Sequence, residues 1–202
     1  MLIILWILGF SFNVSNLIHL LLVVALIVLI IKLITLSLQK EIENKMTKRK
    51  IQYPYSNVDI LPGDILYSSI GRATYYVGHI VIVGTDYLMK ESIPGKPSGH
   101  ALTPLQFWHR HRSGDRITLL RSKVGAFAAA DWATRNLHVI QDYNVLNTNL
   151  HTIEKNYCSK WIVQAYYYGA NVKLINKLNR FIPPQYFKRT EKLMKIAVFL
   201  KA

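Results

Sequence analysis

The sequence is short of cysteine and of acidic residues, and each shortage limits what the protein can be. Its single thiol, Cys158, excludes a disulfide within the chain and fits a reducing compartment. Against 25 Lys and Arg there are 11 Asp and Glu, so the formal net charge is +14. The first 39 residues hold no acid and one base, Lys32, which leaves +13 on residues 40–202 (+14 less +1). So basic a segment suggests an acidic neighbour: anionic lipid headgroups, nucleic acid or an acidic polymer.

Sequence signals of a phosphate site or a metal site are also missing. Residues 93–97, Ile-Pro-Gly-Lys-Pro, lack the spacing of a Walker loop. His109 and His111 are two residues apart at the end of a predicted helix, where they do not converge on one ion, and no cluster of Cys or acids accompanies them. With Arg110 and Arg112 they are interpreted as a solvated basic face. We therefore expect no cofactor and no metal.

One long apolar run lies near the N-terminus, from Leu17 to Leu38, and about 20 such residues cross a membrane as a helix. A buried core helix is disfavoured by the length of the run. A cleaved signal peptide is disfavoured because no basic stretch precedes the run and no small-residue cleavage site follows it. Residues 1–39 are therefore predicted to be a membrane anchor, with the main transmembrane helix over 17–38. The apolar residues 1–10 leave three alternatives open: a helix extension, an interfacial segment or a short second pass.

Basic residues follow the predicted helix, whereas no charged side chain precedes it. They are Lys40, Lys45, Lys48, Arg49 and Lys50. By the positive-inside rule this flank stays in the cytoplasm, so we predict a single-pass protein with a cytoplasmic soluble domain. Residues 40–58 are predicted to be a basic juxtamembrane linker. Each of its basic residues can attract anionic lipid by about 1 kcal/mol near the surface.

The soluble part, residues 59–202, is organised around a predicted β-hairpin over residues 78–91. Two β-rich runs flank Gly84-Thr85-Asp86, a turn of the kind that closes hairpins. A three-residue loop pairs His79 directly with Glu91 on one face, with their Cβ atoms roughly 4.5–5.5 Å apart. A two-residue loop would instead place His79 opposite Lys90. In the first register the carboxylate fixes the tautomer of the imidazole and holds the ring for proton transfer.

The rest of the soluble part alternates between short strands and helices. This predicts an α+β fold in which a small antiparallel sheet packs on helices. The expected elements, in chain order, are a turn and strand over 59–67, a loop over 92–100, a short helix beginning at Pro104, a strand over 116–121, a helix over 126–143, a helix from Cys158 to Gly169, a turn over 181–186 and a basic tail.

Cys158 falls in the first turn of its predicted helix. Unsatisfied backbone N–H groups and the helix dipole favour a thiolate there, and a nearby histidine would favour it further. Cys158, His79 and Glu91 together match the nucleophile, base and orienting group of a cysteine acyl-transfer enzyme, with the backbone N–H of Cys158 as a first oxyanion donor. Taken by themselves, the residues leave a second interpretation open, in which Cys158 and His79 only pack in the core.

A series of short motifs carries a resemblance to a known family. In chain order they are Pro62-Gly63-Asp64-Ile65-Leu66, Gly78-His79-Ile80-Val81-Ile82-Val83, Glu91, Pro104-Leu105 and Tyr157-Cys158-Ser159. The series resembles the circularly permuted branch of the NlpC-type papain-like superfamily, and the YiiX-like and YycO-like proteins above all. The resemblance spans residues 59–195. It implies a permuted papain-like domain over 59–202, in which Cys158 is the nucleophile, His79 the base and Glu91 the third member. Val81 stands where that family usually has a small residue, which narrows the expected site.

Combined with the anchor, the resemblance implies a membrane-anchored cysteine hydrolase or acyltransferase. It would act on an amide or acyl ester through a thioester acyl-enzyme, with the bilayer as one partner and a peptide, an amide or an acyl lipid as substrate. The alternative is a non-enzymatic, membrane-tethered module that binds nucleic acid or anionic lipid through its basic surface. The chain lacks the interleaved aromatic and basic residues of a nucleic-acid platform, which disfavours nucleic acid. Only the enzyme requires Cys158.

Overall fold

A computed structural model of the chain describes residues 16–47, 51–68, 77–175 and 180–201. It divides the chain into two compact units, Met1–Arg49 and Lys50–Ala202. The first unit contains helix α2 (Asn16–Thr47), within which Leu20–Glu41 is long and apolar enough to cross a membrane. The predicted helix is therefore present, and it continues nine residues beyond Leu38. The alternatives for residues 1–10 fall outside the described residues.

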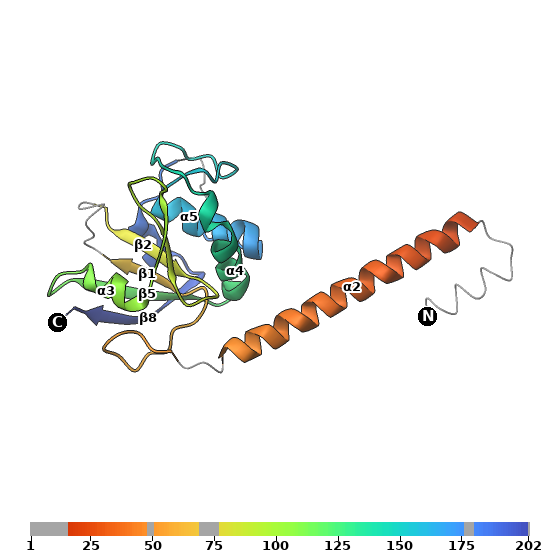
Figure 1. The fold of residues 1–202 in the computed structure, drawn as a ribbon, viewed down its shortest axis with the longest axis horizontal. Helices are drawn as coiled ribbons and strands as arrows, with labels where there is room; N and C mark the ends of the chain where they lie inside the picture. The colour runs from red at the N-terminus through yellow and green to blue at the C-terminus, as the bar shows by residue number, and fades with distance from the viewer. Residues whose placement is uncertain (1–15, 48–50, 69–76, 176–179, 202) are drawn as a thin grey trace. The chain divides into compact units, whose positions relative to one another are not determined.

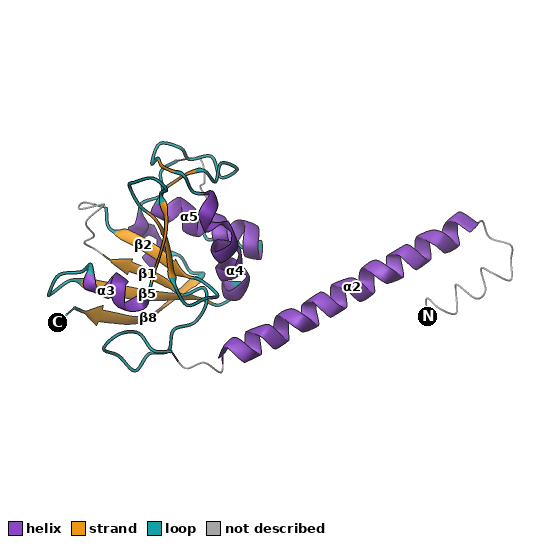
Figure 2. Ribbon diagram, in the orientation of Figure 1, coloured by secondary structure: helices purple, strands orange, loops and turns teal. Residues whose placement is uncertain are grey.

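The second unit is built on a six-stranded antiparallel sheet, whose strands are drawn in orange in Figure 2. The strand order is β4-β3-β2-β1-β5-β8, and every neighbouring pair is antiparallel. The bounds are β1 Ile65–Ser68, β2 His79–Val83, β3 Met89–Ser92, β4 Gly99–Leu102, β5 Arg116–Ser122 and β8 Leu193–Leu200. A separate parallel pair joins β6 (Asp142–Tyr143) to β7 (Lys155–Asn156).

Helices cover both faces of this sheet (Figure 1). On one face lie α4 (Ala126–Asn136) and α5 (Cys158–Gln164), and α5 continues as a π-helical turn over Ala165–Gly169. The shorter α3 (Pro104–His109) lies on the other face. Two 3₁₀ segments complete the unit, Leu137–Val139 and Pro184–Arg189. The predicted α+β architecture, an antiparallel sheet packed on helices, is confirmed.

Both faces of the sheet are buried, which explains the continuous apolar run in β2. All five residues of β2 are buried, and successive side chains point to opposite faces. Ile80 and Ile82 join the cluster that contains Trp161 of α5. Val81 and Val83 join a second cluster, formed with Phe107 and Trp108 of α3. The sheet is therefore the middle layer of three.

The turn before β1 fixes the start of the globular unit. Gly63 has a φ of +85°, and a Cβ there would lie 2.2 Å from the Ala126 carbonyl oxygen, so glycine is required. The Asp64 carboxylate is fully buried and accepts hydrogen bonds from the Tyr53 hydroxyl (2.9 Å) and from Arg121 Nε (2.6 Å). Tyr53 is 1% exposed. The globular unit therefore includes residues 51–58, which the sequence analysis assigns to the juxtamembrane linker.

Three segments differ from the elements predicted for them. The predicted loop over 92–100 contains the start of β4, which pairs with β3. The predicted basic tail contains β8, which pairs with β5. The predicted helix over 126–143 ends at Asn136. The chain leaves the helix because the carbonyls of Ile140 and Gln141 accept hydrogen bonds from the backbone at the start of β4, and residues 142–143 then form β6.

The buried Asp64–Arg121 pair predicts a large stability effect. Asp64→Asn keeps the size of the side chain but removes the charge that Arg121 faces, so we expect a loss of about 3 kcal/mol in the free energy of unfolding. The matched control is Asp131→Asn, which breaks the exposed Arg135–Asp131 pair on α4 and should cost about 0.5 kcal/mol or less. Denaturant titration of the full chain in detergent, followed by tryptophan fluorescence, measures both. Equal effects of the two substitutions would contradict this ranking.

Candidate active site

The hairpin that carries His79 and Glu91 has a longer turn than predicted. Val83 pairs with Met89 and Ile82 with Lys90, so the turn holds the five residues 84–88. The predicted direct pairing of His79 with Glu91 is therefore wrong. Continued from the observed pairs, the register places Glu91 opposite Val81, with His79 two residues away on the same face. Diagonal neighbours of this kind lie within reach of long side chains.

Despite the shifted register, His79 and Glu91 are in contact. His79 Nε2 lies 2.6 Å from Glu91 Oε2, and the two residues are 4% and 0% exposed. The other carboxylate oxygen of Glu91 accepts a hydrogen bond from Arg110 Nη1, at the C-terminal end of α3. One buried carboxylate is thus held between an imidazole and a guanidinium. Charge-assisted bonds of this kind are stronger than neutral ones.

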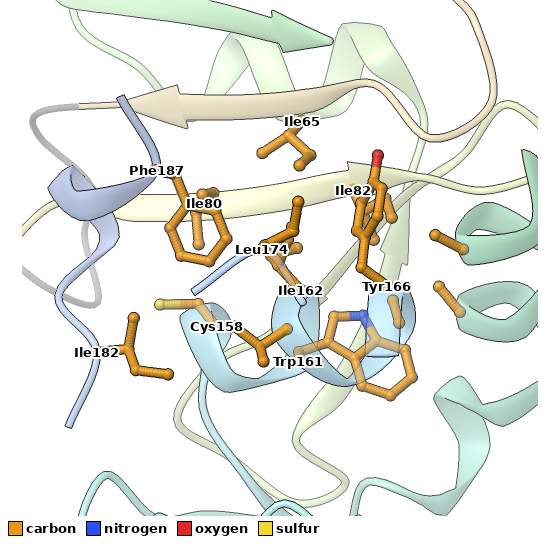
Figure 3. Close-up of a cluster of buried hydrophobic side chains, with 14 of the residues drawn as sticks. Ile65, Ile80, Ile82, Cys158, Trp161, Ile162, Tyr166, Leu174, Ile182 and Phe187 are labelled. Atoms are coloured by element: carbon orange, nitrogen blue, oxygen red, sulfur yellow. The ribbon is translucent and has the colours of Figure 1, made fainter. Parts of the chain in front are cut away.

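The third predicted residue, Cys158, is the first residue of α5 and is 3% exposed. Its thiol interacts with the His79 ring closely enough to change the pKa of both groups. Because His79 Nε2 faces Glu91, Nδ1 is the ring nitrogen left for the sulfur. The structure thus brings the three predicted residues together from α5, β2 and β3. Figure 3 shows the Cys158 side chain at the start of α5, beside Ile182 and below Ile80 and Phe187.

A buried amide network fixes the start of α5. Asn156 Oδ1 accepts a hydrogen bond from the Tyr157 backbone N–H (2.9 Å), and Asn156 Nδ2 donates to Gln164 Oε1 (2.6 Å). Gln164 Nε2 in turn donates to the Leu150 carbonyl (2.7 Å). Both amide side chains are fully buried, so their orientation is set by these bonds. Gln164 therefore has a structural role: it holds Asn156 in place from the opposite end of α5 to Cys158.

The contacts among Cys158, His79 and Glu91 change the pKa of each of these residues. Burial on its own lowers the pKa of His79, but the hydrogen bonds and charges of Cys158 and Glu91 raise it to about 9. Burial raises the pKa of the Cys158 thiol, yet hydrogen bonds and charge from His79, with hydrogen bonds from Ser159 and the Ile80 backbone, leave that pKa below its usual value. The pair therefore favours thiolate beside imidazolium in the pH range between the two values.

The same effects keep Glu91 ionised. Burial raises the pKa of the carboxyl, but the hydrogen bonds and charges of His79 and Arg110 lower it below the usual range. A carboxylate that stays charged is the group that can orient an imidazolium and stabilise its positive charge. Arg110 thus supports His79 through Glu91.

The interpretation of residues 109–112 as a solvated basic face is wrong for two of the four. Arg110 binds Glu91, and His111 is 7% exposed. His111 Nδ1 lies 2.9 Å from the Phe107 carbonyl oxygen, which can only accept, so Nδ1 carries the proton. Burial lowers the pKa of His111, and the charges of His79 and Arg110 lower it further. His111 is therefore a neutral neighbour of the charged pair.

Tyr143 is a site residue that the sequence analysis missed. It lies in β6, and its hydroxyl is near enough to Cys158 for that residue to change its pKa. Burial raises the pKa of Tyr143, and the charge of Cys158 and hydrogen bonding to it raise the pKa further, so the hydroxyl keeps its proton as a donor. The sequence predicts residue 143 at the end of a helix far from Cys158. Only the pairing of β6 with β7, two residues before Cys158, brings it near.

Comparison with known proteins matches two parts of the chain separately. Residues 1–35 match the model of a family of unknown function (DUF5670). No curated protein matches the sequence significantly. Among solved structures, the metalloprotein YiiX from Escherichia coli O157:H7 (DUF1105) matches with a TM-score of 0.50 and 12% identity, over 69% of this chain and 97% of the YiiX chain. At that identity the match shows the fold alone, and the chain therefore contains a YiiX-like fold.

YiiX is described as a metalloprotein. Within the described ranges of this chain, no group of three or more His, Cys, Asp or Glu side chains could hold a metal ion. The side chains around Cys158 pair with one another instead, as acid, base and hydrogen-bond donors. They do not fit a resident metal, and the chemistry proposed for the site uses none.

The thiolate–imidazolium pair predicts the pH dependence of alkylation. Because Cys158 is the sole thiol of the chain, its alkylation by iodoacetamide can be followed by mass spectrometry. We expect the rate to reach half its maximum well below the usual thiol pKa of about 8.5. His79→Ala should move the midpoint to or above that value, since burial of the sulfur remains. His138→Ala, at an exposed histidine, is the control and should leave the midpoint unchanged. The same midpoint in wild type and His79→Ala would contradict the assignment.

Proposed function

We propose that the protein is a membrane-anchored cysteine hydrolase or acyltransferase with a permuted papain-like fold, in which Cys158 is the nucleophile, His79 the base and Glu91 the orienting group. The observation that carries the proposal is the buried group of Cys158, His79 and Glu91, in which His79 Nε2 lies 2.6 Å from Glu91 Oε2 and the thiol and the imidazole change each other's pKa. Its three members come from separate elements, α5, β2 and β3. The YiiX-like fold supports the architecture.

The group formed by Cys158, His79 and Glu91 suits a two-step acyl transfer. The Cys158 thiolate attacks the carbonyl carbon of an amide or ester, a C–S bond forms, and the carbonyl electron pair moves to the oxygen. His79 Nδ1 then gives its proton to the leaving amine or alcohol as the C–N or C–O bond breaks, which leaves a thioester. In the second step His79 takes a proton from water or from another acceptor, which attacks the thioester and releases the thiolate. Glu91 stabilises the imidazolium in both steps.

Two donors beside the sulfur suit the developing oxyanion. The backbone N–H of Cys158 opens α5, where no earlier turn of the helix supplies it with an acceptor. The Tyr143 hydroxyl keeps its proton and lies near the resting sulfur, whose charge helps to raise its pKa. Once the sulfur is acylated and neutral, this hydroxyl can donate to the substrate oxygen. Donors preorganised in this way stabilise the transition state more than the ground state.

The surroundings of Cys158 favour an apolar acyl group. Ile80, Ile182 and Phe187 lie in the same buried cluster as Cys158 (Figure 3). The candidate membrane span and the basic residues after it favour a soluble domain on the cytoplasmic side, at an anionic bilayer. Acyl lipids, lipid-modified proteins and cytoplasmic amides fit these conditions better than cell-wall peptides, which lie on the other side of the membrane.

The proposal predicts that acylation needs His79 as well as the thiol. An alkyne-tagged fatty-acyl thioester should label the wild-type chain on Cys158, and Cys158→Ala should not be labelled. The decisive variant is His79→Ala, which keeps the thiol but loses the base, so labelling should slow by at least about a hundredfold. His138→Ala is the matched control and should label like wild type.

Equal labelling of His79→Ala and wild type would overturn the proposal, because the thiol would then react without its base. If wild type is not acylated but still binds anionic vesicles in a salt-sensitive way, and Cys158→Ala binds equally well, the non-enzymatic alternative replaces it.

Tyr143→Phe tests the proposed oxyanion donor. The substitution removes one hydroxyl and keeps the ring, so kcat should fall by about a hundredfold with little change in KM. Tyr186→Phe, at a half-exposed tyrosine of the 3₁₀ segment 184–189, is the control and should keep wild-type kcat. Steady-state transfer of the tagged acyl group, measured by in-gel fluorescence, gives both constants. If Tyr143→Phe raises KM with kcat unchanged, Tyr143 binds substrate and does not stabilise the oxyanion.

A further inference from the structure

One edge of the sheet carries exposed apolar side chains. On β8 the side chains of Met194, Ile196, Val198 and Leu200 are 39%, 39%, 42% and 66% exposed. β8 is the last strand of the sheet order among the described residues, and it spans eight residues. A β-bulge opposite Leu119 and Leu120 leaves Ile196 without a partner on β5, so Val198 and Leu200 lie on one face of the sheet and Met194, paired with Arg121, lies on the other. We call these four residues, which line both sides of the edge, the β8 edge surface. Soluble proteins usually protect long edge strands with charges, so exposed apolar side chains at such an edge mark a contact surface.

The charged residues around the β8 edge surface are mainly basic. Lys195 is exposed within β8, while Lys192 and Lys201 flank the strand. Arg116 is exposed on β5 opposite Leu200. The acids beside them in the sequence are Glu191 and Asp115, and Asp115 is 7% exposed. Apolar side chains bordered by lysines match the interface of an anionic bilayer, where each basic residue contributes about 1 kcal/mol and the apolar ones enter the acyl boundary.

The segment that follows the anchor packs beside this surface. The Tyr53 and Phe199 rings are 5.4 Å apart, and the Lys201 ammonium lies 5.4 Å from the centre of the Tyr55 ring. Tyr55 itself is 78% exposed, as an interfacial tyrosine would be. Nine residues lie between Glu41, the end of the candidate membrane span, and Ile51, which makes ten Cα–Cα steps. That length of chain covers at most about 35 Å when fully extended.

We propose that the β8 edge surface, with Tyr55 and the surrounding lysines, docks on the anionic leaflet of the membrane to which α2 tethers the chain. A second copy of the chain is the competing occupant, because a free strand edge can pair with another. Charge favours the bilayer, since two copies would bring two strongly basic domains together whereas anionic headgroups neutralise one.

The register of the sheet connects this surface to the site. His79 on β2 pairs with Ser68 on β1, Ser68 with Ile117 on β5, and Ile117 with Phe199 on β8. One row of the sheet therefore runs from the proposed base to the residue next to Leu200. Three strand spacings separate its ends, about 14 Å. Docking at β8 holds the end of the sheet that carries His79 near the interface.

The test measures membrane depth at single positions of the full chain. In a Cys158→Ser background, a nitroxide is placed at Leu200→Cys, and the control label is placed at Leu146→Cys. Leu146 is 87% exposed and lies between β6 and β7, a segment that packs beside β4 at the opposite edge of the sheet. The chain is reconstituted in vesicles of phosphatidylcholine alone, or of phosphatidylcholine and phosphatidylglycerol in equal parts. Electron paramagnetic resonance then reports collision with oxygen and with a water-soluble nickel chelate.

We expect the label at 200 to gain oxygen collisions and lose nickel collisions severalfold in the anionic vesicles, while the label at 146 stays aqueous. Lys195→Gln with Lys201→Gln should remove most of the difference between the two lipid compositions. Equal aqueous accessibility at 200 and 146 in the anionic vesicles overturns the proposal. So does a short distance between labels at 200 on two chains in both lipids, which identifies a second copy as the occupant. Since Cys158 is replaced throughout, neither outcome depends on whether Cys158 is the nucleophile.

Discussion

The packing of α5 against one face of the sheet is the contact on which the rest of the site depends. Trp161, Ile162 and Tyr166 fill the space above Ile65, Ile80 and Ile82 and are at most 1% exposed. Burial of these side chains, worth roughly 1.5–3 kcal/mol each, leaves the helix one position on the sheet. Its first residue, Cys158, then has to lie beside the first residue of β2, His79. Apolar packing on the helix face thus determines a polar contact at the helix end.

The polar contact brings together charged groups that a protein interior would otherwise exclude. Glu91 is fully buried, yet a carboxylate is tolerated because His79 and Arg110 bind one oxygen each. His79 can carry a positive charge only because Glu91 and the Cys158 thiolate face its two nitrogens. The neutral His111 adds no further positive charge to this group. Each member sets the charge of the next, so the group works as one unit and the removal of any member changes them all.

The sequence predicts the parts of the fold that depend on neighbouring residues. Period-2 and apolar patterns place β2, β5 and the beginning of α4, and Pro104 places the start of α3. The Thr103 side chain caps this helix by accepting from the Gln106 backbone N–H. The pairing of distant segments is not encoded in such patterns. β4 begins in a Pro- and Gly-rich stretch and becomes a strand only because β3 lies beside it. β8 pairs with a strand more than 70 residues earlier in the chain.

The candidate site divides in the same way. Cys158, His79 and Glu91 were predicted from the helix start, from strand alternation and from the resemblance to a known family. Arg110 and Tyr143 were not, because each reaches the site through a tertiary contact: the C-terminal end of α3 lies near β3, and β6 pairs with β7. Neither the basic run over 109–112 nor a tyrosine at the end of a helical pattern indicates such contacts in the sequence. Short-range patterns and the resemblance thus identified the three candidate residues, and long-range packing supplied the residues that hold them.

The turn of the hairpin has a consequence for how this protein can change by insertion and deletion. Directly paired residues of an antiparallel ladder share a face, and Val83 pairs with Met89 across a turn of five residues. As long as that pair forms, His79 and Glu91 stay on one face however many residues the turn holds. A single insertion or deletion within β2 or at the start of β3, by contrast, shifts one of them by one position and sends it to the opposite layer. Length variation should therefore be tolerated at residues 84–88 and eliminated between His79 and Val83.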